Sequence, residues 1–197
     1  MFILALIAAI ETGTGATRPQ EIIPKIISVS KEVSKDVAQI IKEPCDDLMI
    51  QHMTLGEFKN KLNFYESRGD YCAKNKYGFV GAYQFSGYMI RTFGKTSKKH
   101  FLENESVQEN AMSLACANYL RHIYKMHYDT LVGRQINGMT ITMEALMLGV
   151  HFSPTYLHRW IKSGGCLNGR DANLSLQQYM TKFEVKNERK LIFERQP

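Results

Sequence analysis

The chain has 197 residues, of which 44% are hydrophobic and 22% are charged, a composition typical of a globular protein with one well-formed core. Its formal charge of +6 and its pI near 9.1 suit an anionic partner. The basic residues are scattered, with no dense arginine run, so the sequence does not favour nucleic acid. An acidic membrane surface or a negatively charged cell-wall polymer fits this charge better.

The N-terminus begins with an apolar run, MFILALIAAI, followed by the small polar stretch ETGTGAT. The run is too short to span a bilayer but suits the core of a signal peptide. Residues 1–16 are therefore predicted to be a signal peptide, which places the protein outside the cytoplasm. No Lys or Arg precedes the run. A truncated start or a poorly cleaved membrane anchor therefore stays open as an alternative.

Residues 17–53 are predicted to form a separate N-terminal helical extension or spacer. Isoleucine and valine recur on one side of this segment, and lysine, glutamate and aspartate lie on the other. Pro44 ends the pattern. It favours a helix that packs on the following domain or spaces that domain from the membrane, and a membrane-surface helix is the alternative.

The next segment is predicted to be a helix that ends in a functional carboxyl group. Thr54 followed three residues later by Glu57 is a capping box, so the helix begins at Leu55, and Gly69 supplies its end. Glu66 falls at the edge of the apolar stripe of this helix. The negative end of the helix dipole and apolar surroundings both raise the pKa of a carboxyl, as a general acid requires.

The glycines and aromatics that follow predict a tight, short-stranded turn region, which folds the Tyr83 hydroxyl and the Gln84 amide back over Glu66. The pair Glu66-Ser67, followed by GAYQF at 81–85, resembles the Glu-Ser and Gly-x-Tyr-Gln-Phe motifs of the lysozyme-like lytic transglycosylases. This resemblance implies a mainly α, lysozyme-like α+β fold with a small β-hairpin region next to the catalytic helix. It also implies a single glutamate that cleaves the glycan of peptidoglycan.

The resemblance also implies roles for individual residues. Glu66 is the expected catalytic acid/base, and the expected substrate-binding residues are Ser67, Tyr83, Gln84, Phe85, Tyr119 and His151. Tyr119-Leu120 resembles a Tyr-Leu pair on a middle helix of the family, which places Tyr119 near the glutamate, although core packing remains an equal alternative.

The chain departs from the family at one position. Where the family has Tyr-Asn before an Ala-Gly pair, this sequence has Leu146, Met147 and Leu148 before Gly149. The missing tyrosine helps to hold the glutamate in the family, and His151 is the candidate to replace it. A purely structural histidine is the alternative.

Helices are predicted for most of the chain after residue 85, each opened by a capping residue: Ser86, Asn104, Thr142, Ser153 and Ser175. The helix capped by Asn104 is expected to run to about Val132, and Asn137-Gly138 predicts a tight turn before the next one. The resemblance to the lytic transglycosylases covers roughly residues 54–183, which implies a lysozyme-like domain over this range, and a charged C-terminal tail is expected at 184–197.

The sequence predicts neither a metal nor any other cofactor. It contains no Cys-x-x-Cys pair and no His-Glu-x-x-His motif. In an exported protein the four cysteines permit two disulfides, but the sequence favours no pairing among Cys45, Cys72, Cys116 and Cys166.

One carboxyl group suffices for an N-acetyl sugar, because the 2-acetamido oxygen replaces the second carboxylate that other glycosidases need. The predicted reaction is cleavage of the β-1,4 MurNAc–GlcNAc bond of peptidoglycan, leaving 1,6-anhydro-MurNAc ends, in the periplasm or cell envelope. A lysozyme-type hydrolase and a catalytically silent peptidoglycan-binding module are the alternatives. A DNA-binding helix-turn-helix at 142–163 is disfavoured, because its second helix offers few polar residues to read bases.

Overall fold

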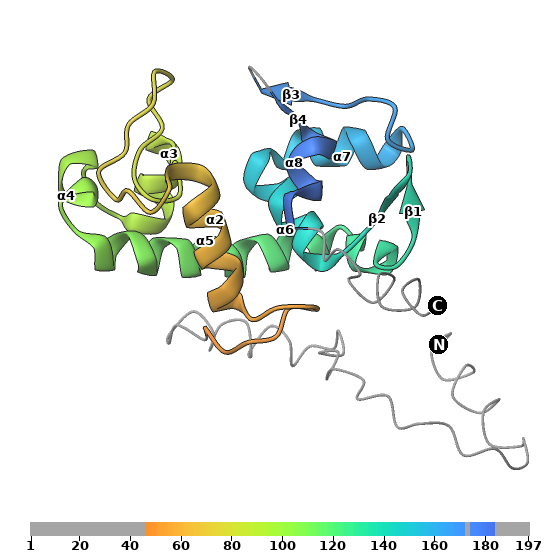
Figure 1. Ribbon diagram of the computed structural model, residues 1–197, viewed down its shortest axis with the longest axis horizontal. Helices are drawn as coiled ribbons and strands as arrows, with labels where there is room; N and C mark the ends of the chain where they lie inside the picture. The colour runs from red at the N-terminus through yellow and green to blue at the C-terminus, as the bar shows by residue number, and fades with distance from the viewer. Residues whose placement is uncertain (1–45, 172–173, 184–197) are drawn as a thin grey trace, which may run out of the picture.

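The computed structural model describes residues 46–171 and 174–183 (Figure 1). This part of the chain is mainly helical, with two small antiparallel hairpins, so the mainly α prediction is confirmed. The signal peptide predicted at 1–16, most of the extension predicted at 17–53 and the tail at 184–197 lie outside the described residues. No described helix combines the length and apolarity that crossing a bilayer requires.

Helix α2 spans Leu55–Ser67 and carries Glu66 in its last turn. Thr54 and Glu57 form the predicted capping box, so the predicted start of the helix is confirmed. The helix ends where Arg68 and then Gly69 adopt left-handed backbone conformations, with φ of 62° and 87°. Gly69 accepts this conformation without strain, and the chain therefore turns away directly after Glu66 and Ser67.

The segment after α2 folds into the predicted tight turn but forms no regular hairpin there. Isolated antiparallel bridges join Lys74 to Val80 and Val80 to Phe85. Gly81 has a φ of 79°, and a Cβ at this position would collide with the side chain of Gln108. The turn therefore requires glycine at residue 81, because both the backbone conformation and the space exclude a side chain.

The middle of the chain forms α3 (Gly87–Met89), a π-helical turn (Ile90–Gly94), α4 (Lys98–Leu102) and the long α5 (Glu105–Lys125). The caps predicted at Ser86 and Asn104 are confirmed, whereas the short α4, capped by Ser97, was not predicted. The predicted end of α5 at about Val132 is wrong. His127 adopts a left-handed conformation with a φ of 57°, and Tyr128–Leu131 form a separate 3-10 turn.

The remaining described residues form the two hairpins and three α-helices. The elements are β1 (Gln135–Ile136), β2 (Met139–Thr140), α6 (Met143–Phe152), α7 (Pro154–Lys162), β3 (Arg170–Asp171), β4 (Leu174–Ser175), α8 (Leu176–Met180) and a 3-10 turn (Thr181–Phe183). Thr142, Ser153 and Ser175 cap their helices as predicted. The hairpin of β1 and β2 turns at Asn137-Gly138, as the sequence predicts.

Figure 1 shows α5 running across the molecule, with α3 and α4 towards one end and α6, α7 and α8 towards the other. Helix α6 packs against α5, α7 and α8, and all of its residues from Met143 to Val150 are buried. Leu146, Met147 and Leu148 are fully buried within it. A helix that is hydrophobic all round belongs in a core, and α6 forms the centre of this half of the fold.

Residues 46–53 belong to the folded domain, although the sequence assigns them to the extension. Glu144 is buried in α6. One oxygen of its carboxylate accepts a hydrogen bond from the backbone N–H of His52 at 2.6 Å, and the other lies 3.3 Å from Nδ1 of His52. The side-chain oxygen of Gln51 accepts a hydrogen bond from the backbone N–H of Met143 at 2.7 Å. These residues therefore pair with polar groups at the start of α6.

Candidate active site

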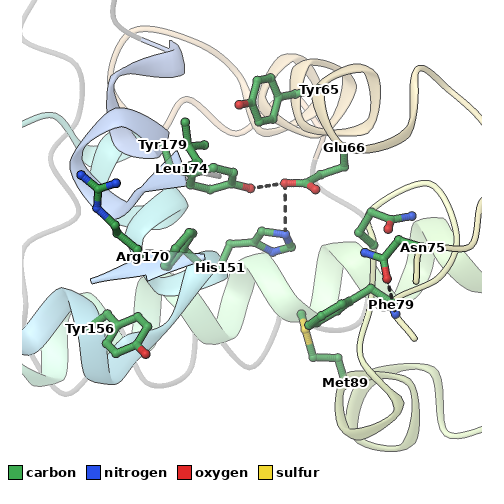
Figure 2. Close-up of a pocket in the computed structure, with 12 residues that line it drawn as sticks. Tyr65, Glu66, Asn75, Phe79, Met89, His151, Tyr156, Arg170, Leu174 and Tyr179 are labelled. Atoms are coloured by element: carbon green, nitrogen blue, oxygen red, sulfur yellow. Dashed lines mark hydrogen bonds and ion pairs between the residues drawn. The ribbon is translucent and has the colours of Figure 1, made fainter. Parts of the chain in front are cut away.

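A cleft of about 440 Å³ lies where the end of α2 meets α6, α8 and the turn region (Figure 2). Its described lining residues are Tyr65, Glu66, Asn75, Phe79, Gln84, Met89, His151, Phe152, Tyr156, Arg170, Leu174 and Tyr179. Figure 2 shows Asn75, Phe79 and Met89 on one side, Arg170 and Tyr156 on the other, and Glu66 between them. Half of these residues carry aromatic rings, counting the imidazole of His151, and Glu66 is the only carboxyl among these described residues.

Glu66 is held in this cleft by groups from two other helices. The Tyr179 hydroxyl on α8 donates a hydrogen bond to Oε1 of Glu66. The His151 Nε2 on α6 lies 4.0 Å from the same oxygen. The Glu66 side chain is 18% exposed, so it faces the groove and not bulk water, as the apolar stripe of α2 predicts.

His151 is neutral at physiological pH. Burial lowers its pKa to about 4, so its contact with Glu66 is not an ion pair at neutral pH. The Tyr119 hydroxyl lies 2.9 Å from Nδ1 of His151. Burial also raises the pKa of Tyr119 well above its ordinary value, so this hydroxyl keeps its proton. With Tyr119 as the donor to Nδ1, the single N–H of the neutral imidazole sits on Nε2, the nitrogen that faces Glu66.

Tyr179 is the main residue of the site that the sequence analysis missed. Burial and the neighbouring Glu66 carboxyl raise its pKa well above the ordinary value, so it stays protonated and acts as a donor. Tyr179 and Glu66 are 113 residues apart in the chain. The capping box of Ser175 and Gln178 marks the start of α8, but no local pattern says which residue the tyrosine meets.

Three of the predicted substrate-binding residues lie near Glu66. Gln84 lines the cleft, and its side-chain amide donates a hydrogen bond to the backbone oxygen of Gly81 at 3.1 Å. His151 contacts Glu66 directly, whereas Tyr119 contacts His151. The expected proximity of Tyr119 to the glutamate is thus indirect, through the imidazole.

The other three predicted substrate-binding residues do not line the cleft. The expectation that the Tyr83 hydroxyl folds over Glu66 is wrong, because this residue is 1% exposed and its hydroxyl donates to Glu109 at 2.6 Å. Phe85 is buried in the core, and the Ser67 hydroxyl donates to the backbone oxygen of Asn63 at 3.2 Å. Gln84 adopts a left-handed backbone conformation with a φ of 50°, and of these three turn residues only Gln84 lines the cleft.

The segment that departs from the transglycosylase motif lies within α6. Leu146, Met147 and Leu148 fill the core around α6 and leave no polar group there to hold Glu66. His151, further along the same helix, and Tyr179 from α8 contact the carboxyl instead.

The described residues contain no group of three or more potential metal ligands. Cys72, Cys116 and Cys166 are free thiols, so no disulfide joins any two of them, and Cys45 lies outside the described residues. Comparison of the chain with protein-family models, with curated proteins and with solved structures finds no match. The function of the cleft is therefore inferred from its own residues.

Proposed function

We propose that this chain cleaves the β-1,4 MurNAc–GlcNAc bond of peptidoglycan as a lytic transglycosylase, with Glu66 as the single acid/base. The observation that carries the proposal is the placement of Glu66 at the middle of an open aromatic cleft, with its Oε1 bound by the Tyr179 hydroxyl and faced by His151. A carboxyl with fixed donors on one oxygen is oriented for proton transfer to a bound substrate.

The shape and lining of the cleft suit a glycan strand. Aromatic rings flank Glu66 along the groove, from Phe79 on one side to Tyr156 on the other (Figure 2). Such rings offer apolar faces to sugar rings, and the Gln84 and Asn75 amides offer hydrogen bonds to acetamido or hydroxyl groups. The absence of a second carboxyl among the described lining residues favours substrate-assisted chemistry over a two-carboxylate mechanism.

The proposed reaction has two steps. Protonated Glu66 first gives its proton to the glycosidic oxygen, while the 2-acetamido oxygen of MurNAc bonds to C1 and the C1–O bond breaks. The Glu66 carboxylate then takes the proton of the 6-hydroxyl as O6 attacks C1, which closes the 1,6-anhydro ring and releases the acetamido oxygen. Glu66 thus returns to its protonated form without water. The Tyr179 hydroxyl stabilises the carboxylate between the two steps.

Glu66→Gln tests the proposal. The amide keeps the size of the side chain but can neither give nor take the proton, so we expect a loss of glycan-cleaving activity of at least about 100-fold with unchanged folding. The measurement is mass spectrometry of the soluble products released from purified peptidoglycan by the original chain and the variant.

The products also separate the alternatives. Anhydro ends that disappear in Glu66→Gln support the transglycosylase, whereas reducing ends identify a hydrolase. Binding to insoluble peptidoglycan with no released product identifies a silent binding module. Full activity of the variant would end the assignment of Glu66.

A further inference from the structure

A second cavity, of about 350 Å³, adjoins the cleft beside the hairpin of β3 and β4. We refer to it as the annex, and its described lining residues are Asn168, Arg170, Ser175, Gln177, Gln178 and Thr181. All are polar and none is acidic. Arg170 lines both the annex and the cleft, so the two cavities meet at this side chain.

The amides of the annex are fixed so that they offer donors. The side-chain oxygen of Gln178 accepts a hydrogen bond from the backbone N–H of Ser175 at 3.0 Å. The side-chain oxygen of Asn168 accepts one from the backbone N–H of Gln177 at 3.1 Å. Because each oxygen is occupied by the backbone, the group that each amide has left for a ligand is its NH₂.

Arg170 adds a cation to these donors. It is the only positively charged side chain among the described residues that line the cleft and the annex. Its backbone is held in register, since β3 pairs with β4 and Arg170 lies opposite Ser175. Arg170 thus lines the annex together with two amide side chains and with no acidic residue among the described lining residues, and such a set of donors is suited to bind a carboxylate.

We propose that the annex binds the carboxylate-bearing side arm of the muramoyl sugar while its glycan lies in the cleft. This inference rests on the proposed function, because it takes the ligand in the cleft to be peptidoglycan. On every second sugar, peptidoglycan carries a lactyl group whose carboxyl is either free or extended by an acidic peptide. Chitin has the same backbone linkage without any carboxylate, and it leaves the annex unoccupied.

The test measures ligand binding to the full chain carrying Glu66→Gln. This variant is expected to bind the ligands without cleaving them, so binding is measured apart from catalysis. The three soluble ligands are matched in glycan length: a peptide-bearing muropeptide, the same glycan with free lactyl carboxyls, and a chitin oligomer. Isothermal titration calorimetry gives a dissociation constant for each. The quantity compared is the preference for an acidic ligand over chitin.

Two variants remove the proposed donors in different ways. Arg170→Gln removes the charge. Gln178→Glu keeps the oxygen that caps α8, since serine and glutamate also form a capping box, but it replaces the NH₂ donor by a carboxylate oxygen. Lys162→Gln is the matched control, because Lys162 is exposed, loses the same charge and lines neither cavity.

We expect the preference for acidic ligands to fall about three- to tenfold in Arg170→Gln and in Gln178→Glu, and to stay the same in Lys162→Gln. A fall for the muropeptide alone identifies the peptide carboxylates as the ligand, and a fall for both acidic ligands identifies the lactyl carboxyl. If both variants keep the preference of the background chain, the annex inference is overturned.

The experiments can contradict the proposed function and the annex inference independently of each other. If the chain with Glu66 intact cleaves none of these glycans and the preference still depends on Arg170, the annex inference stands and the enzyme proposal falls. If the chain cleaves peptidoglycan and shows no preference for acidic ligands, the enzyme proposal stands and the annex inference falls.

Discussion

Glu66 is surrounded by residues that lie far from it in the chain. Tyr179 donates to its Oε1, His151 faces the same oxygen, and Tyr119 contacts the far nitrogen of His151. Each partner is buried and uncharged at neutral pH. These neutral groups therefore help to orient the carboxyl.

Tyr179→Phe removes the hydroxyl that binds Glu66 and keeps the ring that packs against Tyr65 and Phe152. We expect a roughly 10- to 100-fold lower kcat on peptidoglycan, with little change in KM, because orientation of the acid is lost while the cleft keeps its shape. Tyr124→Phe is the control, since it removes a hydroxyl from a partly buried tyrosine outside the cleft. Equal activity of the two variants would exclude a positioning role for Tyr179.

His151 also makes the stability of the fold depend on pH. Its pKa is about 4 in the folded chain and near 6.5 when unfolded, so the unfolded chain takes up the proton first as the pH falls. The contribution of neutral His151 is complete above about pH 6.5 and is lost between there and about pH 4. Because the side chain is buried, we expect the free energy of unfolding to fall by about 2–3 kcal/mol over this pH range.

His151→Gln tests this pH dependence, because glutamine does not titrate. Urea unfolding at about pH 7.5 and about pH 4.5 gives the free energy of unfolding under both conditions. Between these two pH values, the free energy of unfolding should fall by about 2–3 kcal/mol more in the original chain than in the variant. Equal losses in the two chains would show that His151 does not titrate in this range.

At the scale of the elements, a polar cluster joins α2 to α5. Lys59 of α2 is buried, and its Nζ lies 3.0 Å from Oε2 of Glu109 and 3.1 Å from Oδ1 of Asp46. The hydroxyls of Tyr71 and Tyr83 donate to the other oxygen of Glu109, at 2.7 Å and 2.6 Å. Burial and the neighbouring Glu109 raise the pKa of Tyr71 to about 12. This cluster fixes the helix that carries Glu66 against the long central helix.

Lys59→Met breaks this cluster. Burial alone would lower the pKa of Lys59, but hydrogen bonds and charge attraction from Glu109 and Asp46 outweigh it and raise the pKa above 10.5. The lysine therefore stabilises the fold at neutral pH, and this contribution is lost only as the pH rises through the raised value. We expect Lys59→Met to cost about 2 kcal/mol, less than a fully buried pair would, because Asp46 and Glu109 are partly solvated.

Lys61→Met is the matched control, since Lys61 lies exposed on the same helix. Thermal unfolding of both variants at neutral pH measures the difference. A Lys59→Met chain as stable as the Lys61→Met chain would show that the cluster does not contribute to stability.

At the scale of the whole molecule, α6 sets the distance between the parts that form the cleft. Gly149 of α6 packs tightly against α7 and α8, since an added Cβ would lie 2.8 Å from Cδ1 of Leu157 and 3.3 Å from Sδ of Met180. Met180 follows Tyr179 on α8. The close packing at Gly149 therefore determines how near the Tyr179 hydroxyl comes to the cleft.

Gly149→Ala should thus reduce both stability and activity. Overpacking a filled core costs about 1–3 kcal/mol, and a shift of α8 would move Tyr179 away from Glu66. Gly87→Ala is the control, because the nearest atom to its added Cβ is the end of the Arg91 side chain at 3.5 Å. Unfolding in urea and peptidoglycan cleavage are measured on both. A Gly149→Ala chain that matches Gly87→Ala in both measurements would contradict this account.

Local signals in the sequence predict the helices well, because a cap acts within a few residues. Thr54, Thr142, Ser153 and Ser175 each mark a helix start that the structure confirms. The end of α5 was not predicted, because the left-handed turn after the helix falls at His127 and not at a typical helix-breaking residue such as glycine or proline. The short α4 was missed because a helix of this length has little periodicity to detect.

The sequence by itself determined that Glu66 ends an amphipathic helix and that a tight glycine turn brings Gln84 towards the same groove, because both features depend on residues near each other in the chain. Tertiary structure alone decided which groups surround the carboxyl. Tyr83 is buried and its hydroxyl donates to Glu109, whereas Tyr179 of α8 donates to Glu66. Such contacts depend on how helices pack, and packing depends on side-chain volumes summed over the whole core, which no local pattern records.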